Sequence, residues 1–175
     1  MEKVRVNYEK MYYGFPVVLI SYYDNEGNAN ITTLSSSYTL KDMVMLGFSS
    51  KGYAISQIKE VSDFVINIAD GSLMEEINIC GNNTGAECNK FGKANLTPIP
   101  SDVVNAPIIA ECPISIECTL TDIIESDNYK GITNVLATIK GRLVVESKLD
   151  ENGRVKISEL DNIFYFNDGV NRGFK

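Results

Sequence analysis

The chain has 175 residues, a length that fits one domain spanning residues 1–175 with a hydrophobic core of its own. It carries 16 lysines and arginines against 23 aspartates and glutamates, a formal net charge of −7 that argues against binding nucleic acid through a broad basic face. It contains no histidine, which excludes a Ser-His-Asp triad and most zinc sites. We therefore expect no catalytic side-chain relay and no metal site, and we expect any redox chemistry to belong to a bound cofactor.

Neither a membrane span nor a secretory signal is expected, because no apolar run is long enough to cross a bilayer and the first residues, MEKVRVNYEK, are charged. These features predict a cytoplasmic protein. The four cysteines, Cys80, Cys88, Cys112 and Cys118, lack the spacing of a zinc site. We expect plain thiols, and a disulfide, cluster or redox role is the alternative.

Residues 1–13 form either a short strand or an arm that packs on a neighbour. Residues 15–37, FPVVLISYYDNEGNANITTLSSS, predict a β-hairpin with a turn at Asp-Asn-Glu-Gly. Its second strand ends in asparagine, threonine and serine side chains, which offer a row of uncharged hydrogen-bonding groups. That row suits a flat polar heterocycle or a phosphate, and an ordinary hairpin with a solvated polar face is the alternative.

A strand followed by a helix is predicted next. Residues 43–48, MVMLGF, predict a buried strand after a turn at Lys41-Asp42, and residues 53–61, YAISQIKEV, have apolar residues at helical spacing. Residues 49–52, Ser-Ser-Lys-Gly, therefore occupy a strand-to-helix turn. Free N–H groups at a helix start attract anions, so this turn is either a phosphate cradle or a polar turn with a solvated lysine.

The middle of the chain alternates short elements and loops. Residues 63–69 predict a strand, residues 71–78 a short helix and residues 80–85 a polar loop. Residues 86–91 predict one more helical turn. Residues 96–110 contain three prolines and predict a surface loop, which is a candidate specificity segment.

The last third of the sequence predicts strands. Residues 114–120 alternate with period two, and residues 135–146 form a long strand that Gly141 is expected to kink. Residues 125–131 form a turn between them, and the aromatic residues 163–166 close either the core or a ligand pocket. Six or more strands with only a few short helices predict a mainly β fold and a β-barrel.

The order and spacing of several segments resemble the flavin reductase-like, FMN-binding split-barrel family, especially its flavoredoxin-type branch. The match extends over residues 16–173. The segments that carry it are PVVLIS (16–21), GNANITT (27–33), SDFVIN (62–67), CGNNTG (80–85) with NKF (89–91), and AECPISIEC (110–118).

The resemblance implies a Greek-key-like split barrel that forms a homodimer and binds FMN near the subunit interface. The residues that would line the flavin and its ribityl chain are Asn30, Thr32, Thr33, Ser35 and Ser36. The phosphate would be held by Ser49, Ser50, Lys51, Gly52 and Tyr53, next to Ala54. Lys90 would reach the flavin, and Phe166 would pack near it.

The function implied is an NAD(P)H-dependent flavin reductase that passes electrons through FMN to free flavin or to a redox partner. Two alternatives stay open: an FMN electron-transfer module reduced by a protein donor, and a cofactor-less split barrel that serves as a dimeric binding protein. Several positions depart from the family pattern. Lys51 replaces an arginine, Ala54 a threonine, Ser36 a tryptophan and Asn89 an aspartate, and the family's histidine is absent. These departures bear more on nicotinamide use than on flavin binding.

Overall fold

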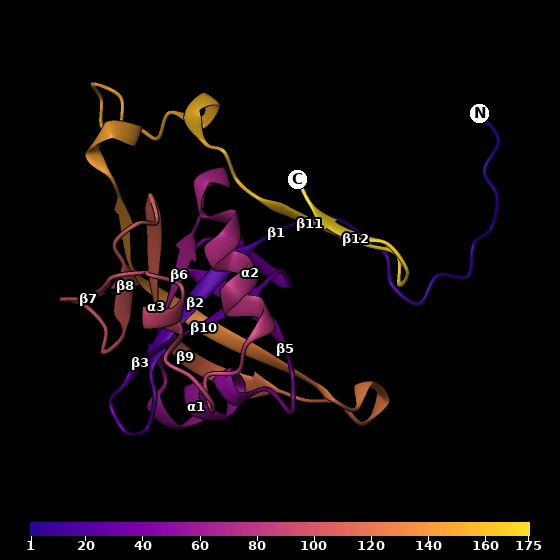
Figure 1. The fold of residues 1–175 in the computed structure, drawn as a ribbon, viewed down its shortest axis with the longest axis horizontal. Coiled ribbons are helices and arrows are strands. Elements are labelled where there is room, and N and C mark those ends of the chain that lie inside the picture. The colour runs from indigo at the N-terminus through magenta and orange to yellow at the C-terminus, as the bar shows by residue number, and fades with distance from the viewer.

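The computed structural model describes residues 1–175 and consists mainly of antiparallel strands with three short α-helices (Figure 1). The strands are β1 (Tyr12–Pro16), β2 (Val18–Tyr23), β3 (Ala29–Leu34), β4 (Ser37–Leu40), β5 (Met43–Ser49), β6 (Asp63–Ile68), β7 (Pro98–Pro100), β8 (Pro107–Ile109), β9 (Ile114–Ile124), β10 (Ile132–Val144), β11 (Phe164–Asn167) and β12 (Arg172–Phe174). The helices are α1 (Tyr53–Val61), α2 (Met74–Asn82) and α3 (Lys90–Lys93).

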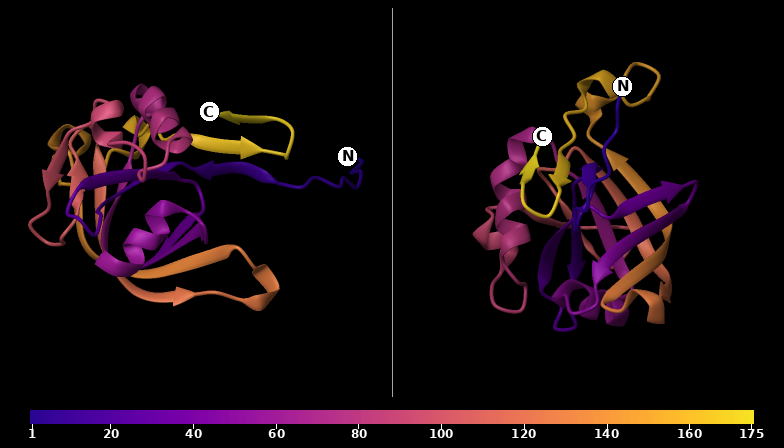
Figure 2. Two further views of the ribbon diagram at one scale, coloured as in Figure 1. Left: turned by 60° about the horizontal axis from the view of Figure 1, so that its bottom comes forward. Right: turned by 90° about the vertical axis from the view of Figure 1, so that its right-hand side faces the viewer.

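Seven strands form one sheet in the order β3-β2-β6-β9-β10-β5-β4. Its two edge strands are neighbours in the chain, because β3 ends at Leu34 and β4 begins at Ser37. Three peptide units span at most about 11 Å, so the sheet must curl until its edges nearly meet. The result is a barrel that stays open between β3 and β4 (Figure 2).

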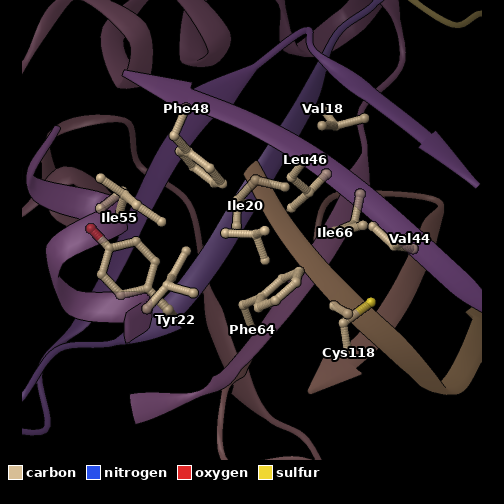
Figure 3. Packing of buried hydrophobic residues seen from close by; sticks show 14 of the residues in the cluster. Val18, Ile20, Tyr22, Val44, Leu46, Phe48, Ile55, Phe64, Ile66 and Cys118 are labelled. Carbon is tan, nitrogen blue, oxygen red and sulfur yellow. The ribbon is translucent and has the colours of Figure 1, made fainter. Parts of the chain in front are cut away.

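Strand β2 is buried on both faces, which explains the continuous apolar run that the sequence places there. Val18 and Ile20 face the interior of the curled sheet, and Val17 and Leu19 face a second core outside it. The interior core also holds Phe64 and residues of α1 such as Ile55 (Figure 3). The outer core is covered by α2 and α3. Helices α2 and α3 also pack against β3, the strand that carries the polar row.

The predicted hairpin, the strand at residues 43–48, the helix at residues 53–61 and the strand at residues 63–69 are confirmed. Two neighbouring predictions were wrong in their bounds. Helix α2 runs through Cys80 to Asn82, where the sequence predicted a loop, because Ile77 and Cys80 lie on one helical face and are both buried. Helix α3 begins only at Lys90, because the Asn89 side chain caps it by accepting from Gly92 N at 3.0 Å.

The segment at residues 96–110 is not a plain surface loop. It contains the strand pair β7 and β8, and Ala106 and Ile109 are fully buried. Asn67 on β6 fixes this segment, since its Oδ1 accepts from Ile109 N at 3.1 Å while its Nδ2 donates to Ser21 Oγ at 2.8 Å. Polar groups buried beneath the segment therefore tie it to the barrel.

The kink predicted at Gly141 is confirmed as a shift in the β9–β10 register between Ile139 and Gly141. A Cβ at this position would overlap the carboxylate of Glu117, which is buried and accepts a hydrogen bond from Ser101 Oγ. The bulge thus provides room for a buried carboxylate beside β10.

A separate small sheet, β1-β11-β12, extends from the barrel together with the N-terminal arm (Figure 2). Its aromatic side chains are unusually accessible: Tyr13 is 74% exposed, and Phe164 and Phe166 are 39% and 40% exposed. The helices of this chain are all too short or too polar to traverse a lipid bilayer.

Candidate functional site

A cleft of about 420 Å³, here called the β3 cleft, lies between β3, the start of α1 and the segment that joins α2 to α3. It is lined by Tyr22, Thr32, Thr33, Leu34, Phe48, Ser49, Lys51, Gly52, Tyr53, Ala54, Asn83, Thr84, Gly85 and Lys90. Its volume lies in the range usual for small-molecule sites. The fold creates it by setting the polar end of β3 opposite the turn that follows β5.

Most of the residues that the sequence predicted for cofactor binding meet in this cleft. They are Thr32, Thr33, Ser49, Lys51, Gly52, Tyr53, Ala54 and Lys90. They come from β3, from the β5–α1 turn and from α3. Segments far apart in sequence therefore converge on one recess.

Five predicted residues lie outside the lining. Asn30 is buried behind it, where Nδ2 donates to Gly85 O at 3.2 Å and supports the wall of the cleft. Ser35 lines a neighbouring cavity. Ser36 lies between β3 and β4, where its carbonyl accepts from Gly47 N on β5 at 2.8 Å.

Ser50 and Phe166 are the other two. Ser50 points to the β9–β10 hairpin, with its Oγ 2.8 Å from Thr133 Oγ1. Phe166 lies on β11 in the small sheet, beside Gly14. Neither side chain lines the β3 cleft of one subunit.

The start of α1 leaves backbone donors free at the floor of the cleft. Gly52 caps the helix without a side-chain hydrogen bond, and no acidic residue occupies the first turn. The first N–H groups of a helix have no partner within it, and they carry the positive end of the helix dipole. With Lys51 beside it, this turn is suited to an anion.

Lys90, on α3, gives the cleft a buried cation. Its side chain is only 4% exposed, and Nζ donates to Cys80 O at 2.8 Å. Burial lowers the pKa of Lys90 below that of an ordinary lysine. No carboxylate lines the cleft, so Lys51 and Lys90 are its only charged residues, although the chain as a whole is acidic.

The segment after α2 supplies residues that we did not assign to the site from the sequence, namely Asn83, Thr84 and Gly85. Lys93 Nζ donates to Asn83 Oδ1 at 2.6 Å and orients that side chain. The signal for this wall was present in the CGNNTG segment, whose small and polar residues permit close approach of a ligand to the backbone.

An acidic recess adjoins the cleft and shares Tyr53 and Gly85 with it. It is lined by the carboxylates of Asp24, Glu26 and Glu87 and by no lysine or arginine. The pKa of Tyr53 is raised by burial and then by the negative charges of Asp24 and Glu26. The boundary at Tyr53 therefore separates a cationic region from an anionic one.

The buried cysteines Cys80 and Cys118 contribute no charge to the site. All four cysteines are free, and burial raises the pKa of Cys80 to about 11 and that of Cys118 to about 12. These two thiols stay protonated near neutral pH, which makes them poor nucleophiles.

Comparisons with known proteins agree with this architecture. The chain is 30% identical over 127 residues to "Uncharacterized protein YdfE" of Bacillus subtilis (strain 168), a match that covers 65% of this chain and 61% of that protein. The chain thus spans less than two thirds of that relative's length. The fold is similar to the structure titled flavoredoxin of Desulfovibrio vulgaris (Miyazaki F), with a TM-score of 0.89, 24% identity and coverage of 99% of this chain and 92% of the other.

A flavoredoxin from Methanosarcina acetivorans superposes with a TM-score of 0.86 at 21% identity, over 100% of this chain and 92% of that one. Together with the curled sheet described above, these likenesses establish a mainly β split barrel. Residues 11–159 match the family described as "Flavin reductase like domain". The chain belongs to the family of the flavin reductase like domain.

Proposed function

We propose that the β3 cleft binds FMN and that the protein is an NAD(P)H-dependent flavin reductase that passes electrons to free flavin or to a redox partner. The observation that carries the proposal is the charge of the cleft. Two lysines and an uncapped helix start face it, no carboxylate does, and the chain has a net charge of −7. Family membership and the flavoredoxin-like fold support a flavin as the ligand.

The β5–α1 turn would hold the phosphate. The N–H groups at the start of α1 would donate to phosphate oxygens, and the ammonium of Lys51 would balance their charge. The acidic recess beyond Tyr53 favours FMN over a dinucleotide flavin, because Asp24 and Glu26 would repel a second phosphate placed there.

Thr33 on β3 and Lys90 on α3 would orient the ring. Thr33 donates its own hydroxyl hydrogen to Ile77 O at 2.9 Å, so its oxygen is left as an acceptor for a ligand N–H. Lys90 would place positive charge beside the ring edge that becomes anionic on reduction. FMN supplies the hydride and electron chemistry when bound, and the chain's part is to position it and stabilise its charge.

A homodimer is part of this proposal. The exposed aromatics of the β1-β11-β12 sheet and the arm that extends from the body form an apolar surface that a second copy of the chain would cover (Figure 2). Sedimentation velocity of the wild type and of Phe166→Glu measures this directly. A dimer that the variant shifts to monomer supports the proposal, and a wild type that stays monomeric contradicts it.

The decisive experiment is titration of the purified protein with FMN, followed by flavin fluorescence and visible absorbance. We expect saturable binding of one FMN per chain, and mixing with NADH or NADPH under anaerobic conditions should bleach the bound flavin. Failure to bind FMN would contradict the whole proposal and favour the cofactor-less binding protein.

A second candidate is an FMN electron-transfer module that does not use NAD(P)H. The acidic recess beside the cleft favours it, because Asp24, Glu26 and Glu87 suit docking of a basic redox protein. Bound FMN that is bleached by a protein donor, but by neither nicotinamide nucleotide, would select this candidate.

A further inference from the structure

A second cavity, here called the α2–β12 cavity, lies beyond the end of β3 and has a volume of about 450 Å³. It adjoins the β3 cleft, with which it shares the lining residues Thr33 and Leu34. It is lined by Val17, Thr33, Leu34, Ser35, Ile77, Asn78, Gly81, Asn82, Tyr165, Arg172, Gly173 and Phe174. A ligand held there would lie next to whatever occupies the β3 cleft.

Arg172 is the only charged residue in this lining. The ion pairs of the structure involve Lys59, Arg142 and Lys156, so the guanidinium of Arg172 is not neutralised by a carboxylate. Arg172 is exposed and lies on β12, where its backbone pairs with Asn167 on β11. A free guanidinium in a cavity without acidic side chains selects for an anion, and its planar fork suits a carboxylate.

The remaining walls suit a flat ring. The rings of Tyr165 and Phe174 lie 5.4 Å apart between centroids at an angle of 41°. The Tyr165 hydroxyl accepts a hydrogen bond from Asn167, which fixes the position of that ring. On the facing helix, Asn78 Nδ2 donates to Met74 O at 2.9 Å, which leaves its side-chain oxygen free. Aromatic walls with a few polar groups are typical of sites for small planar molecules.

We propose that the α2–β12 cavity is the subsite for a small aromatic carboxylate, with the carboxylate on Arg172 and the ring against Tyr165 and Phe174. The proposal rests on the proposed function in one respect. If FMN occupies the β3 cleft, the aromatic carboxylate lies next to the flavin, and small aromatic carboxylates are then the substrate class of the bound flavin. Binding of the carboxylate itself depends only on the residues of the α2–β12 cavity.

The test uses benzoate as the probe and benzamidine, a cation of nearly the same size, as its counterpart. Binding to the full flavin-free chain is measured by calorimetry and by saturation-transfer NMR. We expect benzoate to bind about two- to fivefold more tightly than benzamidine at low salt, because Arg172 is exposed and exposed charge pairs are weak. Equal binding of the two probes would overturn the proposal.

The variant Arg172→Gln keeps a polar side chain and should weaken benzoate binding about two- to fivefold at low salt. Its matched control is Arg154→Gln, which removes an exposed arginine from a turn outside the cavity and should leave benzoate binding unchanged. Thermal melting of both variants verifies that they fold. Unchanged benzoate affinity in folded Arg172→Gln would refute the assignment.

Titration with FMN on the same samples separates this proposal from the proposed function. Wild type that binds benzoate but not FMN would contradict the flavin site and leave the carboxylate subsite supported. Wild type that binds FMN but not benzoate would contradict the carboxylate subsite and leave the flavin site supported. In Arg172→Gln we expect FMN affinity to stay within about twofold of wild type, because Arg172 does not line the β3 cleft.

Discussion

The β3 cleft receives one lysine from the β5–α1 turn, here called its exposed end, and one from α3, here called its buried end, and the surroundings of the two lysines differ. Lys51 is exposed beside a helix start, whereas Lys90 is buried and held by the Cys80 carbonyl. An exposed charge is screened by water and salt, and a buried one acts through a medium of lower dielectric constant. The exposed end should therefore attract a ligand weakly, and the buried end should set how firmly the ligand is held.

The largest expected effect comes from the buried end. Lys90→Met removes the ammonium but keeps the length and apolar stem of the side chain, so the core next to it stays filled. Because hydrogen bonds to charged groups are worth about 1.5–3 kcal/mol, we expect FMN affinity to fall roughly ten- to a hundredfold. Fluorescence titration measures this, and Lys140→Met, which replaces an exposed lysine on β10, is the control.

The pH dependence of Lys90 gives an independent check. Burial lowers its pKa, so the folded state releases this proton at a lower pH than the unfolded chain does. As pH rises through that lowered pKa, the stability of the flavin-free protein should increase while FMN affinity decreases. Both trends should vanish in Lys90→Met. A wild-type affinity that stays constant up to the pKa of an ordinary lysine, about 10.4, would contradict this role.

The wall next to Lys90 should tolerate little change. A Cβ at Gly85 would overlap the side-chain amide of Asn30, which is buried and bonded to the Gly85 carbonyl. We expect Gly85→Ala to destabilise the fold by about 1–3 kcal/mol through overpacking and to weaken FMN binding as the wall shifts. Urea denaturation measures the first effect and flavin titration the second.

Gly92→Ala is the matched control for that substitution. Gly92 lies in α3, and a Cβ there would meet its neighbours only at ordinary contact distances of 3.7 Å and beyond. Alanine also has the higher helix propensity, so stability should stay the same or rise slightly. Equal losses of stability in the two variants would show that the Asn30 contact is not the cause.

At the exposed end, a chain of hydroxyls supports the turn from behind. Thr133 is fully buried and donates to Glu125 Oε1 at 2.7 Å, so its single hydrogen is used and Ser50 must donate to Thr133. Lys59 Nζ forms an ion pair with the same oxygen, Glu125 Oε1, at 2.8 Å and ends this series of hydrogen bonds. Thr133→Val should cost about 1 kcal/mol of stability and weaken FMN binding about two- to threefold by loosening residues 49–52.

Thr138→Val is the control on the same strand, β10. It removes a hydroxyl that pairs with Thr121 in an exposed position, and it should leave stability and FMN affinity almost unchanged. Acid titration distinguishes the chain of hydroxyls from simple packing. The hydrogen bonds from Lys59 and then Thr133 lower the pKa of Glu125, so its contribution to stability is present above its ordinary pKa and is lost as pH falls through the lowered one. The difference between wild type and Thr133→Val should therefore shrink at acidic pH.

Ser50 and Lys51 mark the limit of what the sequence can predict. Periodicity was enough to place both residues in a strand-to-helix turn, and the helix start there is confirmed. It could not say which serine faces the cleft, because that depends on Thr133, which the fold brings from residues far along the chain. Local patterns determine where a turn lies, and tertiary contacts determine where its side chains point.

The distinction between local patterns and tertiary contacts also explains which other features could be predicted from the sequence. The hairpin and the strands of the barrel follow from alternating or continuous apolar runs, so they could be predicted. The convergence of Lys90 with Thr32 and Thr33 was predicted only through the family resemblance. Tyr165 was covered only by the prediction that residues 163–166 close either the core or a ligand pocket, and Arg172 was missed. Their cavity forms only when β12 packs opposite α2, and no local pattern indicates that.

The smallest expected effect belongs to Lys51. Lys51→Ala should weaken FMN binding only about two- to fivefold at low salt, because exposed ion pairs are worth about 0.2–1 kcal/mol. Salt should remove most of that difference, since the screening length falls from about 30 Å at 0.01 M to about 3 Å at 1 M. Lys140→Ala is the control, and FMN titrations at several salt concentrations provide the measurement. The loss caused by Lys90→Met should persist at 1 M salt, because salt does not enter a buried site. If the two lysine variants lost affinity equally and with the same salt dependence, the contrast between the exposed and buried ends of the cleft would be wrong.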